Sequence, residues 1–384
     1  MSYIYFDQAA SSFPKPKKVG EAVLEAINDY GANPGRGGHT LAVRANDVIF
    51  KARKTIAMMF GERNPANVCF YLNATQALNQ AIQGVDFKEG DHVITTSFEH
   101  NSVRRPLERL KDTKGIKVSY IEPAVNGKLL LELIEQEINE NTKAIVVSHG
   151  SNVTGTILPI EEIGKFTKVH DILFVVDASQ TAGILSLDMK EMNIDMLAFP
   201  GHKGLMGPQG TGVLIIRDHV DLIPLIYGGT GSHSEDVQQP EKRPERYESG
   251  TLNTPGIAGL LAGIEELHSI GIESIYEHEA QLTTYCLERL SVIEGIQIYG
   301  PQLHETRLAV ISFTIEGIDV HEVAMILDQH YQIGVRAGLH CSPLTHSLLG
   351  TEDGGAIRVS FGYYNTIEEV DRFIDAIKEI KSFF

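Results

Sequence analysis

The chain has 384 residues, and its 33 basic and 50 acidic side chains give a formal net charge of −17. This length predicts about two domains, and the negative charge argues against nucleic acid as a partner, because phosphate attracts a basic surface. No apolar run approaches the roughly 20 residues that span a bilayer, and the N-terminus lacks the features of a signal peptide. Three cysteines are too few for a disulfide framework, so we expect a cytoplasmic protein without membrane contact.

Short apolar segments alternate with helical patterns between about residues 67 and 220. Several of these segments are continuous runs rich in Val and Ile, as in strands that are covered on both faces. The predicted strands are 68–72, 92–96, 117–121, 144–149, 172–178, 195–199 and 212–217. The predicted helices between them include 75–86, 102–112 and 160–170. This alternation predicts a large α/β/α domain with a mainly parallel sheet of seven strands.

The pattern changes after residue 217. Residues 228–250 are polar and rich in Gly and Pro, which predicts a long loop that is either functional or without fixed structure. The elements predicted after this loop are helices at about 256–270, 273–292, 319–329 and 366–382 and strands near 306–313 and 356–360. They predict a smaller α+β domain over 256–384, which follows a large domain over 16–255.

A lysine in a glycine-rich loop is the strongest candidate for chemistry. Lys203 lies in F-P-G-H-K-G (199–204), directly after a predicted strand, where an α/β sheet presents its carboxyl edge to a ligand. Asp177 ends another predicted strand. Pyridoxal phosphate requires such a pair, a lysine for a Schiff base and an acid that keeps the pyridine nitrogen protonated. A solvated lysine and a helix-capping aspartate remain the alternatives.

Two further strand ends carry polar residues. Ala74 and Thr75 follow the strand 68–72 and open a helix, whose exposed N–H groups and dipole would bind a phosphate. A plain helix cap is the alternative for this segment. His100 follows the strand 92–96 and would stack on a cofactor ring, or else be a structural histidine.

Cys341 stands in a loop with glycines, G-V-R-A-G-L-H-C-S-P (334–343). The nearby Arg336 and His340 are potential cations, and cationic neighbours favour the nucleophilic thiolate. A zinc site is the competing interpretation, but Cys341 with His340 and His346 falls short of four ligands, so we expect no metal. Arg358 lies within a predicted strand, where it would hold a substrate carboxylate or form a buried ion pair.

Taken together, D-A-S-Q (177–180), G-H-K (201–203) and R-A-G-L-H-C (336–341) resemble the motifs of the class V aminotransferase superfamily of fold-type I pyridoxal phosphate enzymes. Within it, the chain is most similar to the cysteine desulfurase and selenocysteine lyase group, from F-D-Q-A-A-S (6–11) onward. The short loop of Cys341 looks like that of the group II desulfurases. Pro200 departs from the pattern, because many relatives carry a serine or threonine there.

The resemblance implies a homodimer that binds pyridoxal 5′-phosphate, with residues 1–15 packed on the small domain. Lys203 would form the Schiff base and move protons, Asp177 would pair with the pyridine nitrogen, and His100 would stack on the ring and belong to the catalytic residues. Gln180 is implied to contact the phenolic oxygen. The residues implied around the phosphate are Ala74, Thr75, His202 and, reaching across a dimer interface, Gly250 and Thr251.

The resemblance also implies the reaction. Asn152 would support the cofactor oxygen as well as the substrate carboxylate. With Arg336 and Arg358 it would bind the substrate, L-cysteine or L-selenocysteine, with Arg358 on its carboxylate. Cys341 would attack the substrate sulfur, take it as a persulfide and leave L-alanine. An acceptor protein, as in iron–sulfur cluster assembly, would then receive the sulfur.

Two other functions stay open. The first is a selenocysteine lyase or a related class V aminotransferase, in which Cys341 is less essential. The second is a thiol or zinc module of sulfur or metal traffic that uses no cofactor.

Overall fold

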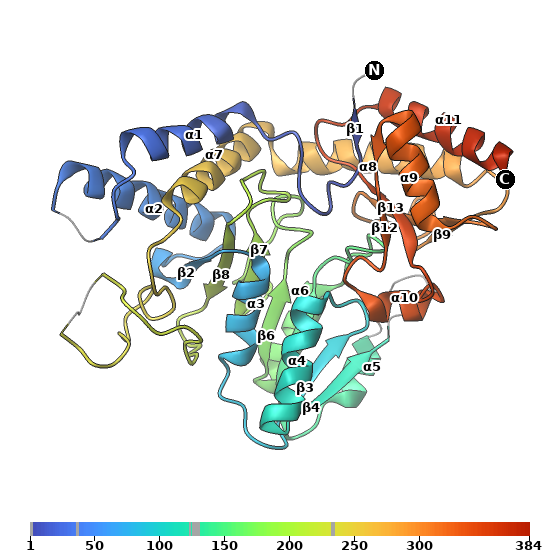
Figure 1. Cartoon of the computed structure of the whole chain (residues 1–384). Coiled ribbons are helices and arrows are strands. Elements are labelled where there is room, and N and C mark those ends of the chain that lie inside the picture. Colours follow the sequence, from blue (N-terminus) through green and yellow to red (C-terminus); the bar gives the residue numbers. More distant parts are fainter. Residues whose placement is uncertain (1–2, 36–37, 123, 125–130, 232–234) are drawn as a thin grey trace.

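The computed structural model describes residues 3–35, 38–122, 124, 131–231 and 235–384. Two lobes are visible in Figure 1, a large one around an extended sheet and a smaller one that carries both ends of the chain. Residues 1–2 of the N-terminal segment and 232–234 of the predicted loop lie outside the described residues. Among the helices of the described part, none has the length and apolar character needed to cross a membrane.

The large lobe is built on one sheet with the strand order β2-β8-β7-β6-β5-β3-β4. Its strands are β2 (Val68–Tyr71), β3 (His92–Thr96), β4 (Lys117–Ile121), β5 (Thr142–Ser148), β6 (Leu173–Asp177), β7 (Met196–Pro200) and β8 (Gly212–Ile216). The pairs from β7 to β4 are parallel, whereas β8 runs antiparallel to both of its neighbours. The predicted mainly parallel, seven-stranded α/β fold is therefore confirmed.

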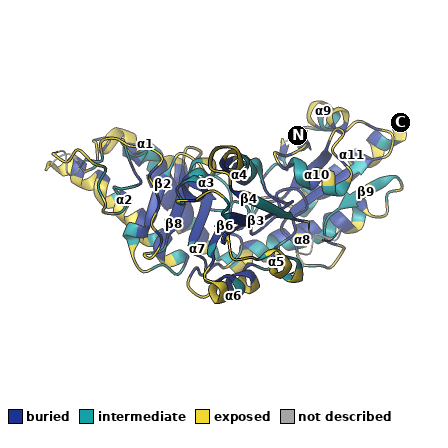
Figure 2. Cartoon of the chain, turned by 90° about the horizontal axis from the view of Figure 1, so that it is seen from below, coloured by how far each residue is buried: buried dark blue, intermediate teal, exposed yellow. Residues whose placement is uncertain are grey.

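Helices cover both faces of this sheet because successive strand residues point to opposite sides. Val176 and Phe199 pack with α2, α6 and α7, whereas Val175 and Ala198 pack with α3 and α4. The helices of this part of the chain are α1 (Lys17–Asp29), α2 (Thr40–Met59), α3 (Ala74–Gln83), α4 (Asn101–Lys114), α5 (Leu131–Glu137), α6 (Ile160–His170) and α7 (Thr254–Ile270), with a 3₁₀ turn at Pro65–Asn67. Figure 2 shows the strands buried between helices whose outer sides are exposed.

The small lobe has its own core around an antiparallel sheet of order β12-β13-β10-β9. Side chains of α8, α9 and α11 pack on this sheet. The elements after α7 are α8 (Ile272–Leu290), β9 (Ile296–Tyr299), β10 (Val310–Ile315), α9 (Val320–Tyr331), β11 (Ile333–Gly334), β12 (Arg336–Gly338), α10 (Pro343–Leu349), β13 (Ala356–Ser360) and α11 (Ile367–Phe383).

The N-terminal segment connects the two lobes. Its strand β1 (Ile4–Tyr5) pairs in parallel with β11, and Ile4 and Phe6 belong to the core of the small lobe. A few residues later, the Ser12 amide donates a hydrogen bond of 3.0 Å to the carbonyl of His202, beside Lys203. The segment therefore ties the small lobe to the lysine loop.

The helix α7 packs differently from what its place in the sequence suggested. Ile257, Leu260 and Ile264 lie in the same hydrophobic cluster as the strands of the large sheet, and α7 packs along α1 and α2. A boundary between α7 and α8 accounts for this packing better than one at residue 256. The division into domains remains a proposal, and we place the boundary near Gly271.

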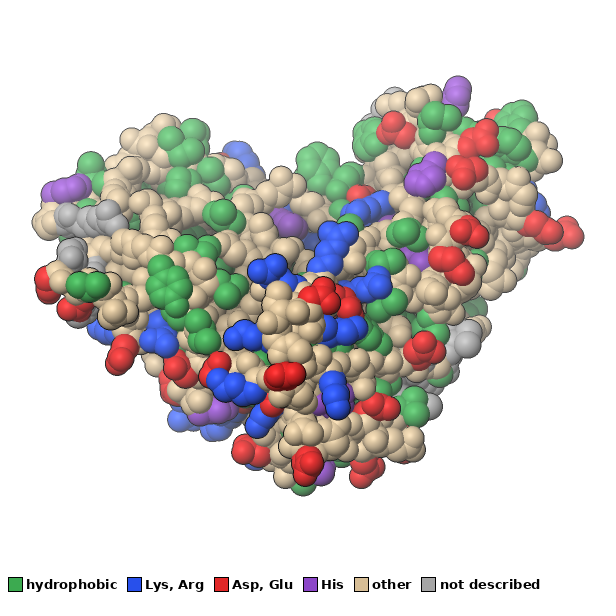
Figure 3. Space-filling model, turned by 60° about the horizontal axis from the view of Figure 1, so that its bottom comes forward, with side chains coloured by type: hydrophobic (Ala, Val, Ile, Leu, Met, Phe, Trp, Pro, Cys, Tyr) green, Lys and Arg blue, Asp and Glu red, His purple; other side chains and the backbone are tan. Residues whose placement is uncertain are grey.

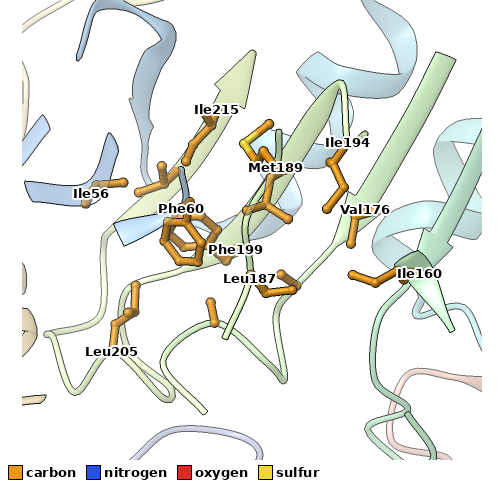
Figure 4. Close-up of a cluster of buried hydrophobic side chains, with 14 of the residues drawn as sticks. Ile56, Phe60, Ile160, Val176, Leu187, Met189, Ile194, Phe199, Leu205 and Ile215 are labelled. Atoms are coloured by element: carbon orange, nitrogen blue, oxygen red, sulfur yellow. The ribbon is translucent and has the colours of Figure 1, made fainter. Parts of the chain in front are cut away.

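The core around Phe60 gives a first prediction (Figure 4). Its ring packs on that of Phe199, with 4.6 Å between the ring centroids, and both side chains are almost fully buried. We expect Phe60→Ala to lower the free energy of unfolding by about 3–5 kcal/mol, because it leaves a cavity in this core. The measurement is urea denaturation. The control Phe383→Ala removes a ring that is 75% exposed and should change the stability by less than about 1 kcal/mol.

Candidate active site

A cavity of about 220 Å³ lies between the lobes, at the carboxyl ends of β5, β6 and β7. Open parallel sheets bind ligands at this edge. The predicted site residues that line it are Ala74, Thr75, His100, Asn152, Asp177, Gln180, His202, Lys203, Arg336, Cys341 and Arg358. Residues from positions 74 to 358 thus meet in one place, and only the predicted Gly250 and Thr251 do not.

Lys203 and Asp177 come from neighbouring parallel strands. Asp177 ends β6 opposite Ala198 of β7, and Lys203 follows in the loop after β7. Burial lowers the pKa of the Lys203 amine to about 8, and the Asp177 carboxylate opposes part of this shift. Within the described part of the chain, this amine forms no hydrogen bond. A buried, reactive amine close to a carboxylate fits the chemistry of pyridoxal phosphate.

The side chains beside Lys203 are held in fixed orientations. Asp177 Oδ1 accepts hydrogen bonds from the backbone amide of Ser179, at 2.9 Å, and from its hydroxyl group. Gln180 Nε2 donates to the carbonyl of Ala9 at 3.1 Å. Burial, with the charges of Lys203 and Lys15, lowers the pKa of His202 to about 4, so this imidazole is neutral at neutral pH. The positive charge next to His202 therefore comes from the two lysines and not from its own imidazole.

His100 is both the cap of α4 and part of the cavity wall. The Ser102 amide donates to His100 Nδ1 at 3.0 Å, which fixes the ring and leaves the proton of the neutral form on Nε2. Ser102 Oγ lies 2.7 Å from Thr75 Oγ1, so the cap also contacts the start of α3. Burial lowers the pKa of His100, and the positive charges of Lys203, Arg336 and Arg105 add to this shift, partly opposed by Asp177.

The start of α3 has the form of an anion site. The Asn73 side chain caps the helix by accepting from the Gln76 amide at 2.9 Å, so the predicted cap is present. The amides of Ala74 and Thr75 belong to the first turn, where a helix offers them no internal acceptor. A Cβ atom at Gly212 would lie 2.3 Å from the Asn73 backbone, so only glycine lets β8 pass so close to this turn.

The loop of Cys341 is short and tightly held. His340 and Cys341 both adopt left-handed backbone angles, with φ of 51° and 59°. The Cys341 carbonyl accepts from the Asn101 amide at 2.8 Å, and Asn152 bonds to the His340 carbonyl and the Ser342 hydroxyl, both at 2.8 Å. Both polar atoms of the Asn152 carboxamide therefore hold this loop. The Cys341 side chain is exposed, with Sγ 3.9 Å from Arg336 Nη2.

His340 differs from the sequence expectation. Burial, and after it the charge of Arg358, lowers the pKa of His340 to about 2. His340 is therefore neutral, and the cation beside the Cys341 thiol is Arg336. His340 Nδ1 lies 3.1 Å from His346 Nε2, and His346 Nδ1 lies 2.8 Å from Thr351 Oγ1. The described residues contain no group of three His, Cys, Asp or Glu side chains able to hold a metal. The two histidines thus brace the loop through each other.

Arg358 forms the buried ion pair that the sequence left open as an alternative. Its guanidinium group is almost completely buried and lies 2.6 Å from Asp7 Oδ1, and Nη1 donates to the Asn152 carbonyl at 3.0 Å. The buried Nε has no hydrogen-bond partner among the described residues. Arg358 also lines the cavity, so it retains a donor for a carboxylate.

Gly250 and Thr251 lie at another surface. They line a separate pocket together with Asn33 and Arg53, and Asn33 Nδ2 lies 3.3 Å from Thr251 Oγ1. Arg53 forms a buried ion pair with Glu248 next to this pocket. The structure therefore does not bring this pair to the cavity of its own chain, and its role across a dimer interface remains a proposal.

Several residues of the cavity wall were not selected from the sequence. They are Ala9, Ala10, Asn73, Ser102, Ser148, Gly150, Ser179, Pro200 and His340. The small residues of F-D-Q-A-A-S-S (6–12) were a usable signal, because short side chains leave room for a ligand. Behind the wall residue Ser148 lies Glu99, which is fully buried and accepts hydrogen bonds from the Ser148 amide and hydroxyl. Burial raises the pKa of Glu99 to about 7.

Comparison with known proteins identifies the family. The model of the family described as aminotransferase class-V matches residues 4–373. The chain belongs to this family.

Several curated relatives that match nearly the whole of this chain are named probable cysteine desulfurases. A probable cysteine desulfurase of Pyrococcus abyssi is 39% identical over 98% of this chain and 94% of its own length. One of Halalkalibacterium halodurans is 34% identical over 99% of this chain and 94% of its own length. The solved apo structure of the cysteine desulfurase of Thermococcus onnurineus matches with a TM-score of 0.94 at 38% identity, covering 100% of this chain and 95% of that one.

The buried amine predicts a particular pH dependence. Reductive methylation of Lys203 by formaldehyde and borohydride needs the neutral amine, so its rate should rise with pH and reach its midpoint near pH 8. Asp177→Asn removes a charge that raises this pKa, so the midpoint should move to lower pH. Mass spectrometry of the Lys203 peptide measures both. A midpoint near that of an ordinary lysine, about pH 10, would contradict the buried site.

The ion pair of Asp7 predicts a stability effect. Asp7→Asn leaves the buried charge of Arg358 without its anion, so we expect the free energy of unfolding to fall by about 3 kcal/mol. Urea denaturation measures the change. Asp375→Asn is a matched control, because its pair with Lys378 is exposed and should contribute less than about 1 kcal/mol. Equal effects of the two substitutions would refute the importance of the buried pair.

Proposed function

We propose that this protein is a pyridoxal phosphate-dependent cysteine desulfurase, which converts L-cysteine to L-alanine and places the sulfur on Cys341. The observation that carries the proposal is the meeting of three groups in one cavity. The amine of Lys203 and the carboxylate of Asp177 lie at its wall, and the exposed thiol of Cys341 completes it. The names of the relatives that match over nearly the whole chain support the same reaction.

The residues present fit the cofactor. Lys203 would hold its aldehyde carbon, Asp177 its ring nitrogen, and Gln180 its phenolic oxygen. His100 would lie on the ring face, and the phosphate would bind to Ala74, Thr75 and His202. When bound, pyridoxal phosphate supplies an electron sink for the bonds at the substrate Cα.

The other steps belong to the chain's own side chains. Arg358, with Arg336 and Asn152 beside it, would orient the substrate carboxylate. The Lys203 amine, with its lowered pKa, would take the proton from Cα and return one to the product. The Cys341 thiolate would attack the substrate sulfur, so that the C–S bond breaks and an S–S bond forms. L-cysteine and a thiol thereby become L-alanine and a persulfide, with no external oxidant.

The proposal also covers the cellular compartment, the oligomeric state and the sulfur acceptor of the enzyme. The three cysteines are unpaired, and Cys69 and Cys286 are buried thiols, which fits the reducing cytoplasm. We propose a homodimer in which Gly250 and Thr251 reach the neighbouring cavity. The persulfide on Cys341 would pass to an acceptor protein, with iron–sulfur cluster assembly as one destination.

The reaction predicts that Cys341 is essential. With L-cysteine, pyridoxal phosphate and dithiothreitol, the protein should release equal amounts of L-alanine and sulfide. Cys341→Ala should lower both rates by at least about 100-fold, because it removes the nucleophile. Cys286→Ala is a matched control that removes a buried thiol outside the cavity and should keep activity near that of the unchanged protein. Alanine and sulfide assays measure the two products.

The same samples distinguish the alternatives. Full release of selenide from L-selenocysteine by Cys341→Ala, with no action on L-cysteine, would favour a selenocysteine lyase. A thiol module without cofactor would be favoured by a different result. The protein would then show no visible absorption band with pyridoxal phosphate, and its absorption spectrum would be the same in wild type and Lys203→Ala.

A further inference from the structure

One helix beside the cavity carries unusual charge for this acidic chain. Arg104, Arg105 and Arg109 lie on α4, and we call them the α4 arginine face. Arg105 and Arg109 are exposed and one helical turn apart, so they project from the same side of the helix, and Arg104 is half-buried beside them. Figure 3 shows lysine and arginine side chains gathered next to the hollow between the lobes, in the region of α4.

The α4 arginine face lies next to the exposed thiol. The first residue of α4, Asn101, donates its amide to the Cys341 carbonyl at 2.8 Å. Arg105 and Arg336 both contribute to lowering the pKa of His100, so both guanidinium groups are within electrostatic range of the cavity. Arg336 also lies 3.9 Å from Cys341 Sγ. Cys341 is thus flanked by positive charge from both lobes.

The nearby acidic groups offset only part of this charge, because Glu108 interacts with Arg104, the half-buried member of the face. Glu108, on the same helix, bonds to Lys111 and to the Tyr120 hydroxyl at 2.9 and 2.8 Å. In the part of the chain that the structure describes, neither Arg105 nor Arg109 forms an ion pair. Arg105 and Arg109 thus form a locally basic, exposed surface on a chain that has 17 more acidic than basic side chains, and an anionic partner would neutralise this surface.

We propose that the α4 arginine face docks an acidic surface of the protein that takes sulfur from Cys341. The inference rests on the proposed function, and it adds the chemical character of the acceptor. Charge attraction across this face brings the acceptor thiol to the mouth of the cavity, where Cys341 is exposed.

The transfer needs no further reagent. The acceptor thiolate attacks the outer sulfur of the Cys341 persulfide, the S–S bond to Cys341 breaks, and Cys341 leaves as a thiolate. The acceptor becomes the persulfide, and the proton of its thiol goes to solvent. Sulfur changes carrier without net oxidation or reduction.

A protein fits this face better than a nucleic acid does. A phosphate backbone would be repelled by the rest of this acidic molecule, whereas an acidic patch of limited size meets only the arginine face. The acceptor must also offer a thiol, which an acidic protein surface can carry and a nucleic acid backbone does not.

The test compares two short peptides with one cysteine each. The first has Asp and Glu around the cysteine, and the second has Asn and Gln at the same positions. With the persulfide enzyme, the acidic peptide should accept sulfur at a lower concentration than the neutral one. In the double variant Arg105→Gln/Arg109→Gln, the half-saturating concentration of the acidic peptide should rise about fivefold, while that of the neutral peptide stays the same. Added salt should reduce the preference of the unchanged enzyme.

The control variant is Lys114→Gln/Lys117→Gln, which removes the same amount of charge at the opposite end of α4. Lys114 is the last residue of α4, about 20 Å from Asn101, and Lys117 begins β4. It should leave the acidic preference intact. Alanine release with dithiothreitol should stay within about twofold in all variants, because neither Arg105 nor Arg109 lines the cavity and Arg105 is the smallest of the influences on His100. Its absence in the unchanged protein would mean that the proposed function itself fails. If that activity is intact, any of three results would overturn the docking proposal. The unchanged enzyme could use both peptides equally, or it could bind single-stranded DNA more tightly than the acidic peptide. Alternatively, sedimentation could show that Arg105→Gln/Arg109→Gln loses its dimers.

Discussion

A lysine amine is kept buried next to a carboxylate without a direct bond between them, and much of the architecture serves this arrangement. Asp177 and Lys203 follow neighbouring strands, so the parallel pairing of β6 and β7 sets their proximity. Each is restrained from its own side, Asp177 by Ser179 and the lysine loop by Ser12 of the N-terminal segment. Because burial disfavours the ammonium form, a larger share of this amine is neutral near neutral pH than in an ordinary lysine.

The sequence predicted the large sheet well because its strands are continuous apolar runs bounded by polar ends. The same pattern located Asp177, His100 and Lys203, since a polar residue after a buried strand stands at the ligand edge. The helices α1 and α2 were not predicted, and the buried side of α2 is largely alanine, which gives a weak periodic signal. The packing of α7 could not be read from its position either, because an apolar helix fits either core.

Contacts between distant residues were beyond the reach of sequence patterns. The pair of Arg358 with Asp7 joins the two ends of the chain, and the sequence showed only that a charge within a strand needs a partner. Similarly, His340 looked like a cation beside Cys341, but its burial against Arg358 and His346 makes it neutral. Burial decides the charge of a histidine, and burial depends on tertiary structure.

The rigidity of the Cys341 loop links the site to its surroundings. Two residues in left-handed geometry and hydrogen bonds from Asn101 and Asn152 restrain the backbone of this loop at the cavity. In the proposed reaction, a persulfide on such a short tether would not reach a distant acceptor, so the acceptor would have to come to the mouth of the cavity. The residues around that mouth, above all those of α4 and β12, would then determine which thiols can approach. On the proposed mechanism, a surface that takes no part in breaking the C–S bond would select the acceptor in the sulfur transfer that follows.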